Sequence, residues 1–133
     1  MTLIDDWITI TDSMYHFTKF DGVYFRGDKK IAINRHGLIR LSVGFCRVTN
    51  VRDFKYSVLF YDPVNKAIAF KFVKTKEKGA VKLTKDKNSL TIAAKLFFST
   101  NNLEEKDCLG RFAWDKLSLP SIGEVYVIEL NKK

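Results

Sequence analysis

The sequence has few of the residues on which covalent cross-linking and metal binding depend. Its 133 residues include two cysteines, two histidines and two prolines. Cys46 and Cys108 each lie among apolar neighbours, and no Cys-x-x-Cys pair occurs, so we expect two thiols buried in a core. A zinc site needs ligands at short, paired spacings, which His16 and His36 do not provide. The sequence therefore predicts no metal and no other cofactor.

Catalytic motifs and long apolar runs are also missing. No glycine-rich phosphate-binding loop occurs, and no Ser or Cys has a nearby His with an orienting acid, so we expect no enzyme activity and no small-molecule substrate. No apolar run approaches the ~20 residues that cross a bilayer. The start, Met-Thr-Leu-Ile-Asp-Asp, has neither the basic nor the apolar region of a signal peptide. We therefore expect a cytoplasmic protein without a membrane partner.

Positive charge is in excess, and it is concentrated in two stretches. The net charge is +8, and residues 26–55 hold eight Lys and Arg against two Asp. Residues 71–87 hold seven Lys against one Asp and one Glu, while the rest of the chain is neutral or acidic. A polyanion needs such a surface, because each neutralised phosphate releases counterions. We therefore predict a nucleic-acid partner, with DNA favoured. The candidate nucleic-acid-binding residues are Arg26, Lys29, Lys30, Arg35, Arg40, Arg47, Lys74, Lys76, Lys78 and Lys82.

Apolar periodicity predicts mostly strands. Alternating or β-branched runs predict strands over 30–34, 38–41, 56–61, 67–73, 79–83 and 90–92, and a strand or extended arm over 3–10. Ser42 is a suitable N-cap for a short helix over 43–50, and a second helix is expected over 93–101. Turns are expected at Asp21-Gly22 and Asp62-Pro-Val-Asn65. The last hairpin is predicted to join 109–114 to 124–130 through a long loop over 117–123.

These elements form a pattern that occurs twice. A strand, a short helix and a β-hairpin follow one another in residues 30–73 and again in residues 88–130. An N-terminal extension, 1–29, precedes the first copy, and a basic connector, 74–87, separates the two. One such unit cannot bury both faces of its own sheet. We therefore predict a β-rich α+β fold in which two strand–short helix–β-hairpin repeats pack into a single domain, 1–133, and a homodimer of that domain.

The repeat resembles a known DNA-binding module. The order of a glycine, a β-run, a short helix and a hairpin, seen in Gly37-Leu-Ile-Arg-Leu41, Phe45 to Val51 and Val58-Leu-Phe-Tyr-Asp62, is similar to the AbrB/SpoVT-type swapped-hairpin proteins. The second copy matches through Leu90-Thr-Ile92 and Val125 to Leu130. Tandem versions of this module occur in MraZ-like proteins of similar length. The resemblance implies DNA binding, with Arg35, Arg40 and Arg47 as contacts.

Two other functions fit the same sequence. Basic residues alternate with aromatic ones in Tyr24-Phe-Arg26 and Phe70-Lys-Phe-Val-Lys74, which suits base stacking with phosphate contact. That composition is similar to the Whirly proteins and the positive-coactivator family of single-stranded-DNA-binding proteins. The alternative is a structural or protein-interaction accessory factor, because no chemical motif is present and the hydrophobic content is high. A continuous positive sheet face would favour nucleic acid, and an exposed apolar patch would favour a protein partner.

Overall fold

The computed structural model describes residues 9–12, 15–18 and 29–131, so the predicted turn at Asp21-Gly22 lies outside the described residues. The described body is one nine-stranded antiparallel sheet in the order β10-β11-β6-β5-β7-β8-β4-β3-β9. Its strands are β3 (Ile31–Asn34), β4 (Leu38–Leu41), β5 (Tyr56–Asp62), β6 (Ala67–Val73), β7 (Val81–Asp86), β8 (Ser89–Ala93), β9 (Gly110–Phe112), β10 (Asp115–Leu119) and β11 (Gly123–Glu129). β1 (Thr9–Asp12) and β2 (Tyr15–Thr18) form a separate two-stranded sheet.

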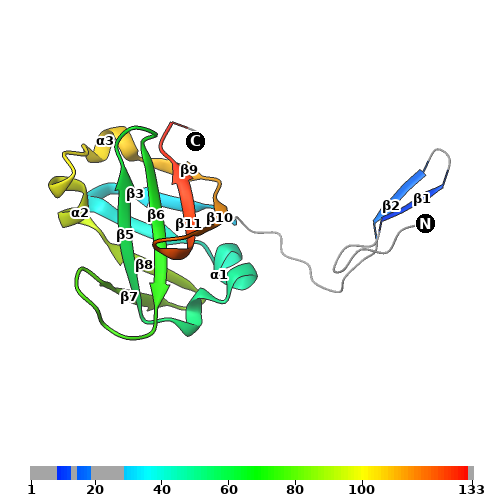
Figure 1. The fold of residues 1–133 in the computed structure, drawn as a ribbon, viewed down its shortest axis with the longest axis horizontal. Coiled ribbons are helices and arrows are strands. Elements are labelled where there is room, and N and C mark those ends of the chain that lie inside the picture. Colours follow the sequence, from blue (N-terminus) through cyan, green and yellow to red (C-terminus); the bar gives the residue numbers. More distant parts are fainter. Residues whose placement is uncertain (1–8, 13–14, 19–28, 132–133) are drawn as a thin grey trace.

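The helices are short. They are α1 (Val43–Thr49), α2 (Lys95–Thr100) and α3 (Glu105–Cys108), with single 3-10 turns at η1 (Arg35–Gly37) and η2 (Val51–Asp53). η1 contacts α2 and α3 and leads into β4, whereas α1 follows the other end of β4. The helices therefore cover two opposite ends of the sheet, as Figure 1 shows. The prediction of a β-rich α+β fold is confirmed.

The sheet curls so that its two edge strands approach each other at one end. β7 joins two halves: Tyr56 and Ser57 of β5 pair with Lys82 and Val81, and the rest of β7 pairs with β8. The edge strands β9 and β10 are consecutive in the chain, separated by two residues, Ala113 and Trp114. Three peptide links reach at most about 11 Å. The end of β9 and the start of β10 therefore lie close together, and the half-sheets face each other across one core (Figure 1).

The core follows from the period of two along each strand. Ile31, Ile33, Ile39, Leu41, Leu90 and Ile92 project inward from one half-sheet, and Ile68, Phe70, Tyr126 and Ile128 project from the other. Phe45 of α1 is fully buried between them, in ring contact with Phe72, Trp114 and Tyr126. Burying a side chain of this size contributes about 1.5–3 kcal/mol. The Cys46 and Cys108 side chains are both buried in the same core, as their apolar neighbours predict.

Local chemistry determines where α1 begins and ends. The Ser42 hydroxyl accepts a hydrogen bond from the Phe45 amide at 3.2 Å, which confirms the predicted N-cap. Asn50 ends the helix in the left-handed conformation, with φ of 60°. At η1 the chain needs Gly37, because φ is +70° and a Cβ would lie 2.7 Å from the Lys95 Cα.

The predicted final hairpin is wrong. β11 pairs with β10, Leu119 opposite Gly123, whereas β9 pairs with β3 at the far edge of the sheet. The predicted strand over 109–114 therefore contains β9 and the two residues, Ala113 and Trp114, that link β9 to β10. Leu117 and Leu119 alternate with Lys116 and Ser118 in β10, so the segment predicted as a long loop is mostly a strand. Only residues 120–122 remain as its turn.

Candidate nucleic-acid interface

One row of side chains crosses the outer face of the half-sheet β9-β3-β4-β8-β7. The strand register places Arg111, Ala32, Arg40, Thr91 and Thr84 opposite one another in succession. We call this row the arginine row. Its neighbours along the strands, such as Ile31 and Ile39, are buried, so the row itself faces solvent. Arg40 and Arg111 are exposed, and Ala32 between them is only partly so. Two strand spacings separate the arginines, about 10 Å.

A groove lies beside this row, where the two half-sheets join. Its lining residues are Phe54, Lys55, Tyr56, Lys82, Leu83, Thr84 and Lys85, and its volume is about 590 Å³. We call it the lysine groove. The Leu83 amide donates to the Lys55 carbonyl at 2.9 Å, and β5 then separates from β7. Within the described part of the chain, the β5 side of Thr84 to Asp86 has no pairing strand. The groove therefore combines three exposed lysines with an open strand edge.

Aromatic side chains form part of the groove. Phe54 and Tyr56 are half-buried, and the Lys74 ammonium lies 5.8 Å from the centroid of the Phe54 ring. Phe54 in turn packs on Phe72, with 6.4 Å between ring centroids. The Phe54 ring thus packs against the core, and both Phe54 and Tyr56 line the groove. A base or another flat group could stack there.

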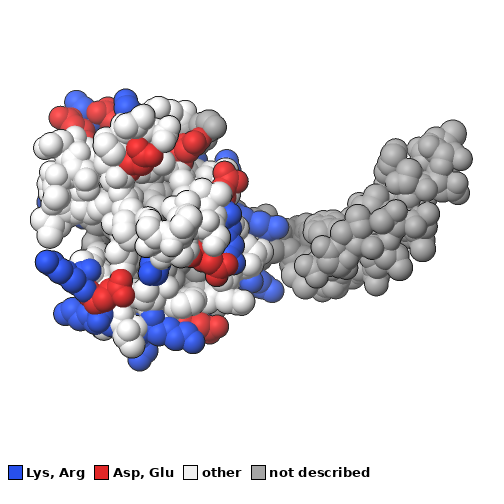
Figure 2. Space-filling view, in the orientation of Figure 1, with Lys and Arg blue, Asp and Glu red and all other residues white. Residues whose placement is uncertain are grey.

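The row and the groove are continuous, because Thr84 belongs to both. From Thr84 to Arg111 the row spans four strand spacings, about 19 Å. Two exposed acidic residues adjoin the groove in sequence: Asp53 before Phe54 and Asp86 after Lys85. In Figure 2 Lys and Arg gather along the lower margin, over β7 and the β6–β7 loop, whereas the middle of the visible face is largely uncharged. On the visible face, basic residues are thus concentrated at the margin over β7.

The predicted site residues are only partly brought together. Arg40 lies in the arginine row, Lys82 in the lysine groove and Lys74 beside Phe54. The others, apart from Arg26, which lies outside the described residues, are exposed but are placed elsewhere: Lys76 and Lys78 in the β6–β7 loop, Lys29 and Lys30 before β3, Arg35 in η1 and Arg47 on α1. η1 and α1 lie at opposite ends of β4. Arg35 and Arg47 therefore lie towards opposite ends of β4 and not together beside Arg40.

Three basic residues of this surface were missing from the predicted set: Lys55, Lys85 and Arg111. Lys55 and Lys85 belong to the two basic stretches, so charge alone could have included them. Arg111 could not be found in this way, because its segment is neutral overall. Only the pairing of β9 with β3, Ala32 opposite Arg111, brings it into the row.

Lys116, by contrast, is held away from this surface. Its ammonium lies 3.4 Å from the Glu124 carboxylate and 5.8 Å from the centroid of the Tyr126 ring. The pKa of Lys116 is raised above its ordinary value, first by Tyr126 and then by Glu124. Both contacts lie on β11, in the other half-sheet. A charge compensated in this way adds little to phosphate binding.

Other chemistry has less support among the described residues. No group of three or more His, Cys, Asp and Glu lies close enough there to hold a metal ion. The described helices are all too short to cross a lipid bilayer, the longest having seven residues. No protein-family model, curated protein or solved structure matches this chain. The basic surface is therefore the feature on which a function can be argued.

Proposed function

We propose that this chain is a non-enzymatic nucleic-acid-binding protein, with DNA as the favoured ligand. The observation that carries the proposal is the continuity of the lysine groove and the arginine row through Thr84. Five exposed cations lie along this path: Lys82, Arg40 and Arg111 are on the outer face, and Lys55 and Lys85 line the groove beside it. Small side chains, Ala32, Thr84 and Thr91, lie between them, so a phosphate backbone can approach the sheet closely.

The number of cations predicts a salt dependence. If each of the five neutralises one phosphate, the logarithm of the binding constant should fall with the logarithm of salt concentration with a slope of about −4.5 for duplex DNA or about −3.5 for a single strand. Fluorescence anisotropy with labelled single- and double-stranded oligonucleotides over a salt series measures this slope. Absence of binding at low salt, or binding that salt does not weaken, would contradict the proposal.

Matched variants identify the surface. Arg40→Gln and Arg111→Gln should each reduce the slope by about 1 and weaken binding to all sequences. Lys106→Gln removes the same charge from α3, where Lys106 is paired with Glu104 at 3.5 Å on the surface, and should leave binding unchanged. An equal loss in all three variants would show that net charge, not this surface, is responsible.

A single strand is the second candidate, favoured by the aromatic lining of the groove. Phe54 and Tyr56 can stack unpaired bases but have no access to bases inside a duplex. Tyr56→Ala should then weaken binding to single-stranded oligonucleotides and leave duplex binding unchanged. An equal effect on both ligands would exclude base stacking in the groove.

We further propose that the domain consists of two hairpin–helix–hairpin units. The first is β3–β4–α1–β5–β6, and the second is β7–β8–α2–β10–β11. Two pairings support this proposal, because β4 pairs with β8 and β6 with β11, so the equivalent strands of the two units are antiparallel neighbours. Exchanging the units maps each of these two pairs onto itself, whereas the pairing of β5 with β7 has no counterpart between β10 and β3.

An experimental structure of the chain tests the duplication. Superposing the first unit on the second should align both hairpins and the helix between them in one operation. A superposition that aligns one hairpin and misplaces the helix or the other hairpin would contradict it.

A further inference from the structure

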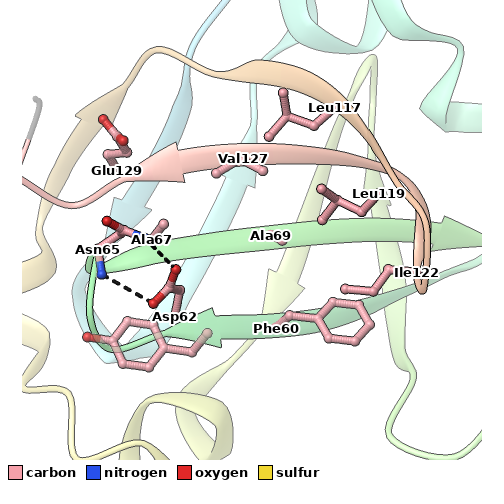
Figure 3. A pocket seen from close by; sticks show the side chains of 11 residues that line it. Phe60, Asp62, Asn65, Ala67, Ala69, Leu117, Leu119, Ile122, Val127 and Glu129 are labelled. Carbon is pink, nitrogen blue, oxygen red and sulfur yellow. Dashed lines mark hydrogen bonds between the residues drawn. The ribbon is translucent and has the colours of Figure 1, made fainter.

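The outer face of the other half-sheet carries an apolar groove. The groove has a volume of about 530 Å³ and is lined by residues of β5, β6, β10 and β11 and of the turns that join them. Its apolar side chains are drawn in Figure 3: Ala67, Ala69 and Val127 along the floor, Leu117 and Leu119 on the β10 side and Phe60 on the β5 side. We call this surface the apolar face.

This face is separate from the core. Ala67 and Val125 are buried, yet neither belongs to the core cluster between the half-sheets. Leu117 is 43% exposed, and Phe60 and Val127 are partly exposed. A contiguous apolar patch of this kind on a folded domain marks a contact with another molecule.

Three carboxylates lie at one end of the apolar face. Asp62 and Glu129 belong to one row, because each of them pairs with Ala67. Asp115 is exposed and pairs with Val127 in the next row, which makes it a diagonal neighbour of Glu129 at about 7–8 Å. Figure 3 shows Asp62 and Glu129 at one end of the groove, whereas its other end is apolar.

Positive charge is not part of the groove. None of the described side chains that line it is Lys or Arg, although the whole chain has a net charge of +8. Lys66 in the β5–β6 turn and Lys71 on β6 adjoin the groove without lining it. Hydrogen bonds from Asn65 lower the pKa of Asp62, so this carboxylate is charged at neutral pH. The groove therefore offers an occupant an apolar surface with negative charge at one end.

We infer that the apolar face binds an extended segment of a partner protein, in which apolar side chains are followed by Lys or Arg. The apolar side chains would lie on the alanine floor between Phe60 and Leu117, and the cation would reach Asp115 or Glu129. Charge complementarity favours this occupant. A small molecule fits less well, because ligand sites enclose most of their ligand and the walls of this groove are half-exposed. An extended chain needs cover on one side only.

A second copy of the chain is a poorer occupant of this face. A two-fold contact centred on the row of Phe60, Ala69 and Val127 would place the Asp115 carboxylates of the two copies against each other. Like charges placed opposite each other in an interface disfavour the contact. The predicted homodimer is therefore not assigned to the apolar face.

Three synthetic peptides of equal length test the inference by nuclear magnetic resonance. The first has apolar residues followed by Lys and Arg, the second has the same apolar residues followed by Glu and Asp, and the third has serines followed by Lys and Arg. The first peptide should shift the amide signals of Ala69, Leu117 and Val127 until they saturate. The other two should leave these signals unchanged, because each lacks either the cation or the apolar side chains.

The inference goes beyond nucleic-acid binding and does not depend on it. The arginine row lies on the outer face of the opposite half-sheet, so the core separates it from the apolar face. The peptides are added without nucleic acid, and the signals that report on them belong to the apolar face. Failure of the inference is therefore distinguishable from failure of the proposed function.

Matched variants locate the contact. Asp115→Lys should weaken binding of the first peptide at least about threefold, whereas Asp107→Lys, the same change at an exposed position of α3, should not. Ala69→Met fills the floor and should also weaken binding, whereas Ala80→Met in the β6–β7 loop should not. In the double variant Asp115→Lys with Glu129→Lys, the second peptide should shift the groove signals and the first should no longer do so. Thermal unfolding shows whether each variant is folded.

Four outcomes would overturn the inference. The first is a wild-type chain whose groove signals do not respond to the first peptide, or respond equally to all three. The second is binding that is unchanged in folded Asp115→Lys and Ala69→Met variants, which would locate the contact elsewhere. The third is self-association that Ala69→Met weakens, which would make a second copy the occupant. The fourth is a shift of the same signals by octylamine but not by the first peptide, which would identify a small-molecule site.

Discussion

The ring of Phe45 meets the indole of Trp114 edge-on, with 5.0 Å between ring centroids and 89° between planes. Phe45 belongs to α1, and Trp114 lies in the two-residue link between the edge strands β9 and β10. The Trp114 indole N–H donates to the Lys29 carbonyl at 2.8 Å, immediately before β3. The contact between Phe45 and Trp114 therefore connects α1 to the segment that links the two edge strands, β9 and β10.

Truncation of Phe45 should be severely destabilising. Phe45 is fully buried and contacts three other rings, so Phe45→Ala leaves a cavity that the sheet cannot fill. We expect a loss of about 3–5 kcal/mol in the free energy of unfolding. Phe45→Leu should lose only about 1–1.5 kcal/mol, because most of the volume remains. Urea denaturation measures both, and a loss below that of Phe45→Leu in the alanine variant would show that the ring is not central to the core.

Two glycines with similar backbone conformations should differ in their tolerance of alanine. Gly37 and Gly79 have φ of +70° and +82°, so alanine is strained at both. Gly79 has no atom within 4 Å of an added Cβ, whereas at Gly37 the Cβ would lie 2.7 Å from the Lys95 Cα. Gly79→Ala should therefore lose about 1–2 kcal/mol in the free energy of unfolding. Gly37→Ala should lose at least about 1 kcal/mol more, since backbone atoms must move. Thermal unfolding of the two variants measures these losses. Equal losses in the free energy of unfolding would mean that η1 accommodates the added Cβ at no further cost.

Charge reversal should distinguish the lysine groove from the loop beside it. Lys55→Glu, Lys82→Glu and Lys85→Glu together should abolish oligonucleotide binding at moderate salt, because they replace three cations in one groove. The same change at Lys74, Lys76 and Lys78 in the β6–β7 loop should weaken binding but leave it measurable. Gel-shift titration of both triple variants gives the comparison, with thermal unfolding as the check on folding. A larger effect from the loop triple would move the site away from the groove.

Local chemistry made much of the fold predictable. The N-cap at Ser42 and the turn at Asp62 to Asn65 both depend on residues within four positions of each other. The approach of the two edge strands, by contrast, depends on residues that are far apart in the sequence. Trp114 and Lys29, whose hydrogen bond connects β3 to the β9–β10 link, are 85 positions apart. Taken alone, the run 109–114 has the pattern of one strand. Only the pairing of β9 with β3 shows that the strand ends at Phe112 and that Ala113 and Trp114 link it to β10.

The candidate site likewise combines residues that local charge predicts with residues that only the strand pairing brings together. Arg40 and Lys82 could be selected because their segments carry excess charge. Their position on one continuous surface depends on β7 pairing with both β5 and β8. Arg111 comes from a neutral segment, and the register of β9 against β3 alone brings it within two strands of Arg40. Charge patterning thus predicts a basic surface but not its shape.

The Asp62 carboxylate should titrate below its ordinary pKa of 3.8. The Asn65 side-chain amide donates to one carboxylate oxygen at 2.7 Å, and the Asn65 and Val64 backbone amides donate to the other, which favours the charged form. A pKa lowered by folding stabilises the folded state above the unfolded pKa, and this contribution is lost as pH falls through the folded pKa. The stability difference between wild type and Asp62→Asn should therefore be present at neutral pH, decrease as pH falls below about 4, and be lost only below the folded pKa. Carboxyl chemical shifts in a pH titration measure the pKa directly, and a value at or above 3.8 would contradict the turn geometry.

The Cys46 thiol should be unreactive in the folded protein. It is 4% exposed and lies 3.6 Å from the Leu41 carbonyl, to which it donates a hydrogen bond. Burial raises the pKa of this thiol above its ordinary value, and the opposing effects of Arg52 and the Leu90 backbone are smaller. Since the thiolate is the reactive species, both its protonation and its burial slow the reaction with a thiol reagent. In a Cys108→Ala variant, where Cys46 is the single thiol, Ellman's reagent should react orders of magnitude more slowly with the folded chain than with the chain in denaturant. Comparable rates in the two states would mean that α1 opens readily, and Phe45 would then not be held as the ring contacts indicate.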